Sequence, residues 1–436
     1  MKNIIRQHWG VMFLTAVALS FIALQAFFST QRKNSLVEVY FADRMTEAHR
    51  HLIEEYNRLH EGTIKVIPID FPNEDFTTNE RKEVLARSLR GEGENIDLFA
   101  VDVVWVQRFA RWGEPLDQYF DKSELDGITN ETLQSCYKDG KLVAIPFDQV
   151  RGVLLYRQDL LGALPGGKKF MDKVNKGITW DDFIEYAMGL QRSHPYYIFP
   201  AAEYEGLLCV YTEVLLSRGE DYFAKHGFNF QTPQAEKALQ LLVDLVQKYK
   251  VTPTEVMSMT EVSSYEFFSK NQGLFLRGWT NFDKDFPLTA DQKKHFRIAQ
   301  LPHFKDGFPA STIGGWDLMV SKFSPKKKEA ISFIKFLLRK ESQELIYTEG
   351  GFFPVIRAIF DDEIYKKKYP ELIQTYHMLA GGAHRPSHEK YTKYSEILVH
   401  YIAAAIREDM SVPDALAKAT HAIESEKLTL TQEQDR

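Results

Sequence analysis

The sequence is poor in cysteine. Only Cys136 and Cys209 occur in its 436 residues. Two cysteines cannot form the disulfide framework of a small secreted scaffold, and neither belongs to a Cys-x-x-Cys pair that could bind zinc or exchange disulfides. We therefore predict two free thiols, with Cys209 in the core of the fold.

Catalytic motifs are also missing. No Gly-x-Ser-x-Gly, His-Glu-x-x-His or phosphate-binding loop occurs. His384 and His388 flank Pro386, so they cannot share a helix face as a pair of metal ligands would. Asp97 and Asp102 stand at opposite ends of a predicted strand, with no His or Lys base in the same region. These motifs give catalysis no support, and we predict a protein without a metal or another cofactor.

The chain has no long basic run. Lys and Arg number 54 against 60 Asp and Glu, which gives a net charge of −6. Four of the basic residues lie in residues 1–34, which hold no acidic residue, so the remainder carries −10. This balance excludes general affinity for nucleic acids, and it disfavours a phosphorylated or strongly anionic ligand.

Aromatic residues, by contrast, are abundant, with 31 Phe, 20 Tyr and 6 Trp. Hydrophobic residues make up 44% and charged residues 26% of the chain, as in an ordinary folded protein. At roughly 150 residues per domain, the length allows two or three domains. Most of the rings must pack in cores, but their number also suits a ligand that stacks on aromatic faces.

The first 34 residues differ from the rest of the chain. Two basic residues precede an uncharged stretch from Trp9 to Thr30, and two more follow it. The stretch exceeds the ~7–15 apolar residues of a signal peptide and approaches the ~20 that span a bilayer. Ala26 is the best residue before a cleavage point, but Leu24 stands where a small residue is wanted. We predict export to the periplasm or the outer face of the cell membrane, by a cleaved signal or an uncleaved anchor.

After residue 35, short apolar runs alternate with segments of helical period. This order predicts a largely parallel sheet with helices on both faces. The predicted strands are 37–42, 64–69, 98–101, 143–145, 153–156, 273–276 and 318–321. The predicted helices include 77–90, 235–249, 325–348, 391–407 and 411–425.

An ordered set of motifs extends over the whole exported part of the chain. The motifs are Asn95–Ala110, Asp139–Asp148, Gly152–Leu160, Thr179–Phe183, Leu276–Trp279, Ser311–Asp317 and Arg385–Pro386. Each motif alone has little specificity, but together and in this order the motifs resemble those of the family 1 extracellular solute-binding proteins. Within that family, the chain is most similar to the trehalose/maltose-binding proteins that serve ABC importers.

The resemblance implies an α/β, two-lobed, periplasmic-binding-protein-like fold of class II, with a central cleft and a hinge. Because the segments 146–152 and 299–304 connect strands of different lobes, we predict that the two lobes are interleaved in sequence. The predicted parts are a signal peptide or anchor helix at 1–34, lobe 1 at 36–146 plus 303–350, lobe 2 at 150–298 plus 355–428, and a frayed tail at 429–436.

The resemblance also implies a ligand-binding site in the cleft. Asp102 would accept hydrogen bonds from sugar hydroxyls, while Trp279 and Trp316 would lie against the apolar faces of pyranose rings. Gly314 and Gly315 would let the backbone approach the ligand closely. The other implied or plausible site residues are Arg385, Arg81, Asp148, Tyr204 and Glu205.

Several of these residues have a purely structural alternative. The indoles of Trp279 and Trp316 could be core residues, because Trp is usually highly buried. Asp102 could cap the turn or helix that follows its strand, and Arg385 could pair with a surface carboxylate. The segment Asp148–Arg151 departs from the pattern of relatives, so neither the sugar nor its chain length follows from the resemblance.

Three functions are compatible with these features. The favoured one is the substrate-binding component of a carbohydrate ABC transporter, a monomer that binds a neutral di- or oligosaccharide and delivers it to the permease subunits in the membrane. A membrane-anchored sugar receptor that feeds a sensor or signalling partner is the alternative. A secreted carbohydrate-active enzyme would need two cleft carboxylates ~5–10 Å apart, and only Asp102 is placed in the cleft on sequence grounds.

Overall fold

The computed structural model describes residues 20, 36–71, 78–91, 95–191, 194–219, 221–286, 288–380 and 382–425. Apart from Ser20, the predicted leader lies outside these residues, as does the predicted tail 429–436. Within the described ranges, no helix combines the length and the apolar character needed to cross a membrane.

The strands follow one path in the order β2-β1-β3-β10-β6-β8-β7, and β9 also pairs with β6. Parallel pairing joins β1 to β2 and β3, and β7 to β8. β10 runs antiparallel to β3 and β6, and β6 runs antiparallel to β8 and β9, so the sheet is mixed and the prediction of a largely parallel sheet is wrong. The strands of this path are β1 Val37–Asp43, β2 Ile64–Asp70, β3 Leu98–Asp102, β6 Ile145–Arg157, β7 Tyr197–Ile198, β8 Phe275–Trp279, β9 Phe296–Ala299 and β10 Ile313–Val320.

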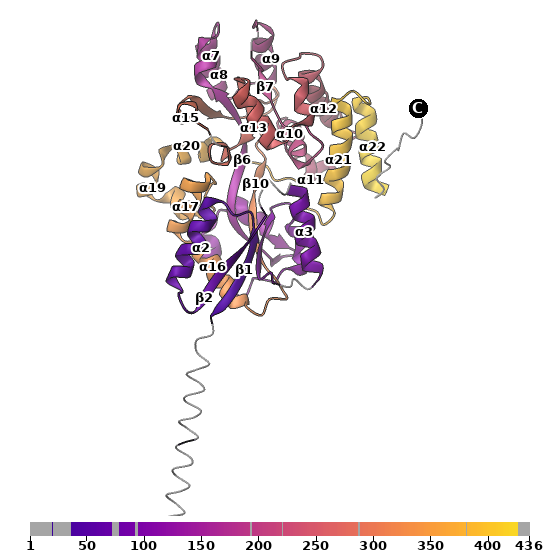
Figure 1. Ribbon diagram of the computed structural model, residues 1–436. Helices are drawn as coiled ribbons and strands as arrows, with labels where there is room; N and C mark the ends of the chain where they lie inside the picture. The colour runs from indigo at the N-terminus through magenta and orange to yellow at the C-terminus, as the bar shows by residue number, and fades with distance from the viewer. Residues whose placement is uncertain are drawn as a thin grey trace, which may run out of the picture.

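The strand β6 belongs to both halves of the molecule. Its residues 145–151 pair with β10, and its residues 152–156 pair with β8. In Figure 1, β6 runs from the lower half, which contains β1 and β2, into the upper half, which contains β7. The change of partner therefore falls between Arg151 and Gly152, where the two halves meet.

Helices cover both halves (Figure 1). In the lower half, α16 packs against β1, α2 packs against β2, and α17 packs against α2. In the upper half, α10, α12, α21 and α22 pack together. These helices are α2 Glu47–Leu59, α3 Thr78–Arg90, α10 Glu205–Leu216, α12 Pro233–Val246, α13 Glu261–Lys270, α16 Lys327–Leu337, α17 Lys340–Gly350, α21 Tyr391–Ile406 and α22 Val412–Ser425.

Shorter elements connect these parts. The short helices are α4 Val106–Phe109, α5 Lys122–Asp126, α6 Asn130–Leu133, α7 Gln158–Ala163, α8 Gly167–Asn175, α9 Trp180–Met188, α11 Tyr222–His226, α14 Phe282–Asp285, α15 Ala290–His295, α18 Arg357–Asp361, α19 Glu363–Lys368 and α20 Pro370–Met378. A separate two-stranded sheet consists of β4 Tyr137–Lys138 and β5 Lys141–Leu142.

The prediction of two separate strands at 143–145 and 153–156 is wrong, because a single strand, β6, begins at Ile145 and continues through 153–156. A proline inside a central strand removes a ladder hydrogen bond, so Pro146 favoured two separate strands over one continuous strand. The structure places a register shift opposite it, between Trp316 and Asp317 of β10. Such an irregularity leaves one residue unpaired and lets the strand continue past the proline.

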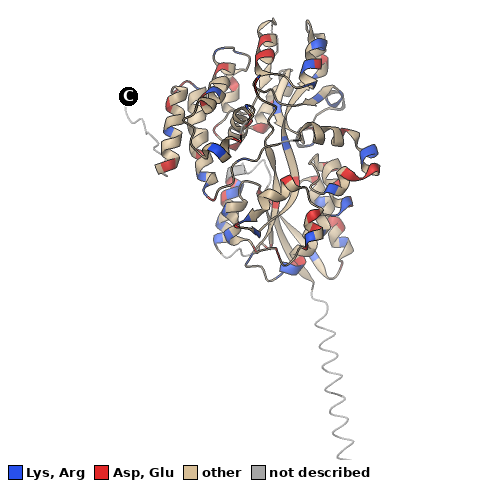
Figure 2. Cartoon of the chain, turned by 180° about the vertical axis from the view of Figure 1, so that it is seen from behind, with Lys and Arg blue, Asp and Glu red and all other residues tan. Residues whose placement is uncertain are grey.

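The chain crosses between the halves more than once, since it leaves the lower half along β6 and returns along β10. We propose the lobe boundaries predicted above, and this crossing pattern supports them. The core is a hydrophobic cluster that continues through both halves. Cys136 and Cys209 are free thiols as predicted, and both are buried. Acidic and basic side chains are interspersed over the helices of both halves (Figure 2).

Candidate functional site

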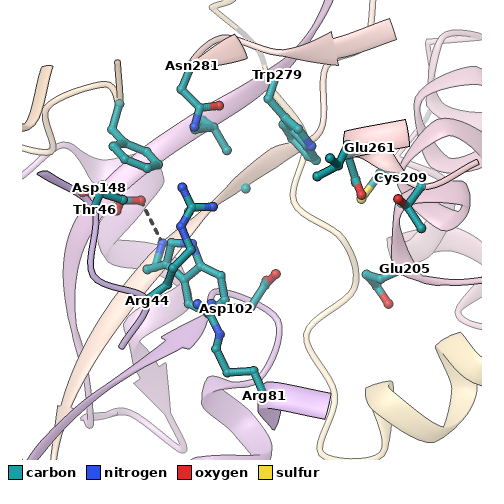
Figure 3. Close-up of a pocket in the computed structure, with 18 of the residues that line it drawn as sticks. Arg44, Thr46, Arg81, Asp102, Asp148, Glu205, Cys209, Glu261, Trp279 and Asn281 are labelled. Atoms are coloured by element: carbon teal, nitrogen blue, oxygen red, sulfur yellow. Dashed lines mark hydrogen bonds between the residues drawn. The ribbon is translucent and has the colours of Figure 1, made fainter. Parts of the chain in front are cut away.

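A cavity of about 460 Å³ lies where the two halves meet. All of the residues predicted to bind ligand line it: Arg81, Asp102, Asp148, Tyr204, Glu205, Trp279, Gly314, Gly315, Trp316 and Arg385. They come from strands, helices and irregular segments of both halves, as Figure 3 shows for those it labels. The structure therefore brings together residues that are far apart in the sequence.

Trp316 lies half-buried at the lower side of the cavity. Its backbone N–H donates to Asp148 Oδ1 at 3.1 Å, across the pairing of β10 with β6. The Arg81 guanidinium lies over the indole, with its Cζ 3.5 Å from the ring centroid, and the Trp105 ring meets the indole edge to face at 5.7 Å. The indole is thus fixed in orientation but open to the cavity, unlike a residue of the core.

Trp279 is the last residue of β8 and lies half-buried at the upper side. Gly314 stands beside it, and a Cβ on this glycine would come within 3.2 Å of the indole Cζ3 atom. Gly315 has a φ of 139°, and a Cβ there would lie 2.4 Å from the backbone oxygen of Asp148. Both glycines lie within β10, which begins at Ile313 and not at the predicted Leu318. A larger side chain at either position would collide with these neighbouring atoms.

Arg385 connects the two halves through carboxylates. Its Nη2 donates to Asp102 Oδ1 at 2.9 Å, and its Nη1 donates to Glu205 Oε1 at 2.7 Å. Asp102 ends β3 in the lower half, whereas Glu205 begins α10 in the upper half. The arginine side chain is 2% exposed, so this is a buried interlobe bridge and not a surface pair.

Asp102 has the capping role considered from the sequence, and its side chain also lines the cavity. Besides accepting from Arg385, its Oδ1 accepts the backbone N–H of Val104 at 3.1 Å, which stabilises the turn after β3. The Tyr391 hydroxyl donates to Glu205 Oε1, so the second carboxylate of the bridge is also held by two donors. These contacts set the positions of both carboxylates at the edge of the cavity.

Arg81 extends from α3 into the same site and is buried. Its Nη1 is 3.6 Å from Asp43 Oδ1, and its Nη2 has no hydrogen-bond partner among the described residues. Burial lowers the pKa of Arg81 to about 10, and the nearby carboxylate of Asp43 opposes that change. The guanidinium therefore keeps its charge at neutral pH and has a donor left for a ligand.

Asp148 is fully enclosed at the base of the cavity. Burial raises the pKa of Asp148 well above its ordinary value, the charge of Asp43 raises it further, and the N–H of Trp316 opposes the rise. This rise favours the protonated carboxyl, which can donate as well as accept a hydrogen bond. A neutral partner such as a hydroxyl suits this group better than an anion.

Several lining residues were missed from the sequence, including Asp43, Arg44, Glu261 and Asn281. In Figure 3, Asn281 lies on the same side of the cavity as Trp279, and Arg44 lies across from them. A signal existed for Asp43, because it ends β1 beside β3, and the carboxyl ends of parallel strands meet at one edge of a sheet. The other three had no spacing or motif that set them apart.

The stability of the protein is expected to fall as pH rises from about 4 to about 7, because of Asp317. Burial raises the pKa of Asp317 to about 7, and the Ser135 hydroxyl, 2.9 Å from Oδ2, opposes the rise. The unfolded chain loses this proton near pH ~3.9, so the folded protein binds more protons between the two values. Urea unfolding across this range should show a shallower loss in Asp317→Asn, with a remaining slope from Asp148 and Glu205, whose pKa values burial also raises. An unchanged slope in the variant would contradict this assignment.

A two-lobed α/β fold with a cavity between its halves is typical of proteins that bind a ligand in an interlobe cleft. Residues 51–372 match the family model for the bacterial extracellular solute-binding proteins. The chain belongs to this family. The predicted family and fold are confirmed, and so is the prediction of a binding protein with no reaction of its own. The name of the family also agrees with predicted export from the cytoplasm.

Solved structures and curated proteins show the same relationship. The chain is 26% identical to maltose-bound MalE3 of T. maritima, with 90% of this chain and 100% of that chain covered and a TM-score of 0.78. The cyclic alpha-maltosyl-1,6-maltose binding protein of Arthrobacter globiformis has the same fold, at 23% identity, 90% and 98% coverage and a TM-score of 0.72. A probable ABC transporter-binding protein of Deinococcus radiodurans is 25% identical over 351 residues, 77% of this chain and 79% of that protein.

Proposed function

We propose that the protein binds a neutral di- or oligosaccharide in this cavity and delivers it to the membrane subunits of an ABC importer. The observation that carries the proposal is the pair of half-buried indoles, Trp279 and Trp316, that line one cavity. Flat aromatic faces suit the apolar faces of pyranose rings, and such a pair can hold a ligand of more than one ring.

The polar groups of the cavity support the same ligand class. Carboxylates at Asp102 and Glu205 accept hydrogen bonds, while Arg81 and Arg385 donate them, and all four side chains line the cavity. Because these charges already pair with one another or with neighbours, the described part of the site presents no uncompensated cationic cluster for a phosphate. Sugar hydroxyls, which both donate and accept, can meet groups of both kinds.

The names of similar proteins support the substrate and the transport role. MalE3 of T. maritima was solved with maltose, and the Deinococcus radiodurans protein carries an ABC transporter-binding name. The lactose-binding protein of Rhizobium radiobacter is 26% identical over 256 residues, 57% of this chain. A membrane-anchored receptor that feeds a sensor stays the alternative, and it depends on whether residues 1–34 remain attached.

A panel of sugars should identify the ligand class by thermal stabilisation. Maltose, trehalose, lactose and a maltodextrin are the test ligands, and glucose 6-phosphate is the anionic control. A ligand that binds only the folded protein stabilises it by about 2.7 kcal/mol at a hundredfold excess over Kd, so a true substrate should raise the melting temperature and change Trp fluorescence. Stabilisation by the phosphorylated sugar alone, or by no sugar in a wide panel, would contradict the proposal.

A further inference from the structure

A buried ion pair lies directly behind one of the two indoles. Arg277 of β8 donates from Nε to Glu213 Oε2 at 2.9 Å and from Nη2 to Glu213 Oε1 at 2.6 Å. The Arg277 side chain has no exposed surface, and that of Glu213 is 4% exposed. Neither residue lines the cavity, so the pair does not contact a ligand there.

The surrounding backbone makes room for this pair. Gly152 of β6 lies against it, and a Cβ on this glycine would come within 1.9 Å of Glu213 Oε1 and 2.9 Å of Arg277 Nη2. The backbone N–H of Thr312, which directly precedes β10, donates to the same Glu213 oxygen at 3.3 Å. The carboxylate thus joins α10, β8 and the start of the strand that carries Trp316.

The guanidinium also contacts the indole of Trp279. Arg277 Cζ lies 4.1 Å from the centroid of that ring, well inside the ~6 Å range of a cation–π contact. Both residues belong to β8 and stand two positions apart, so their side chains share one face of the sheet. Because the arginine is fully buried, the indole surface that it covers is closed to the cavity.

We propose that Arg277 and Glu213 are positioning residues for the ligand site, which hold the Trp279 indole in one orientation and leave a single face for a sugar ring. The proposal rests on the proposed function, since it takes Trp279 to be a platform for sugar. Glu213 fixes the guanidinium through two hydrogen bonds, and the planar guanidinium fixes the indole by stacking. A flat and rigid platform loses little conformational entropy when it binds, which favours affinity.

The substitution Arg277→Lys removes the planar group that covers the Trp279 indole but keeps a positive charge beside Glu213. Lysine keeps a cation beside Glu213, so no buried carboxylate is left alone, but it has no planar group to cover the indole. If this variant does not fold, Arg277→Met with Glu213→Gln replaces the whole pair by uncharged groups of similar volume, which often costs little stability. Each variant is made in the wild-type chain and in a Trp279→Ala chain.

The first measurement needs no ligand. If the guanidinium covers one indole face, Arg277→Lys should increase acrylamide quenching of Trp fluorescence in the wild-type chain and should not in the Trp279→Ala chain.

The second measurement is calorimetric titration with maltose. Arg277→Lys should weaken maltose binding by about tenfold, within the range of a desolvated cation–π contact, and by less than about twofold when Trp279 is already alanine.

The matched control is Lys326→Met. Lys326 Nζ also pairs with a buried carboxylate, Asp97 at 3.0 Å, and lies 4.9 Å from the centroid of the Tyr40 ring, but it is not part of the cavity. Its loss should leave maltose affinity and the quenching of Trp279 unchanged.

Two results would overturn the positioning role: unchanged quenching in Arg277→Lys, or an equal loss of affinity in the wild-type and Trp279→Ala chains. Absence of maltose binding together with increased quenching would count against maltose as the substrate and would support the positioning role. The two proposals can therefore fail separately.

Discussion

Replacing Trp316 with alanine is expected to weaken binding of the best sugar by about 2–4 kcal/mol, roughly 30- to 1000-fold, while the protein still melts cooperatively. The indole is only half-buried and lines the cavity, so its loss removes ligand contact more than core packing. The hydrogen bond to Asp148 is made by the backbone N–H of residue 316 and survives the truncation. Calorimetric titration, after a thermal melt of each variant, measures both effects.

Trp180→Ala is the matched control for this result. Trp180 begins α9, is 3% exposed and does not line the cavity. Loss of such a core indole should cost about 3–5 kcal/mol of folding stability, with sugar affinity unchanged in the protein that remains folded. The opposite pattern for Trp316, a large loss of stability with wild-type affinity, would place that residue in the core and reject it as a platform.

Much of the fold could be predicted because its elements have regular hydrophobic periods. The strands 37–43 and 64–70 and the helix 412–425 lie within one or two residues of the predicted ranges. The short strand β9 at 296–299 was missed, since half-buried edge segments have too few apolar residues for a clear period. The fold class itself came from ordered motifs, which depend on family resemblance rather than on physical pattern.

The contacts of the site could not be predicted to the same degree. Arg385 and Asp102 are 283 residues apart in the sequence, and Arg385 and Glu205 are 180 apart, so no local spacing indicates that they meet. Arg277 and Glu213 are 64 residues apart, which is also too far for a local spacing to indicate their pairing, and both look like ordinary charged residues in the sequence. Burial decides their roles, and burial of a charged side chain follows from the packing of several elements at once.

The bridge made by Arg385 gives the second large expected effect. Arg385→Gln should weaken sugar binding by about 2–5 kcal/mol, because the guanidinium holds Asp102 and Glu205 in place and lines the cavity itself. It should also lower folding stability by about 3–5 kcal/mol, since the carboxylates of Asp102 and Glu205, each 13% exposed, would lose the cation that they share. Urea unfolding and calorimetric titration measure these losses.

The pH dependence and a second substitution separate the two losses caused by Arg385→Gln. Burial raises the pKa of Glu205, and Arg385 opposes that rise, so without the arginine the folded variant takes up protons more readily than its unfolded chain. The stability of Arg385→Gln should therefore be best at low pH and decline as pH rises, more steeply than in the wild type. Adding Glu205→Gln removes one of the unpaired carboxylates and should restore most of the stability, whereas sugar affinity should stay low because the donor has gone. If Arg385→Gln binds sugar like the wild type, the bridge holds the lobes together without contributing to the ligand site.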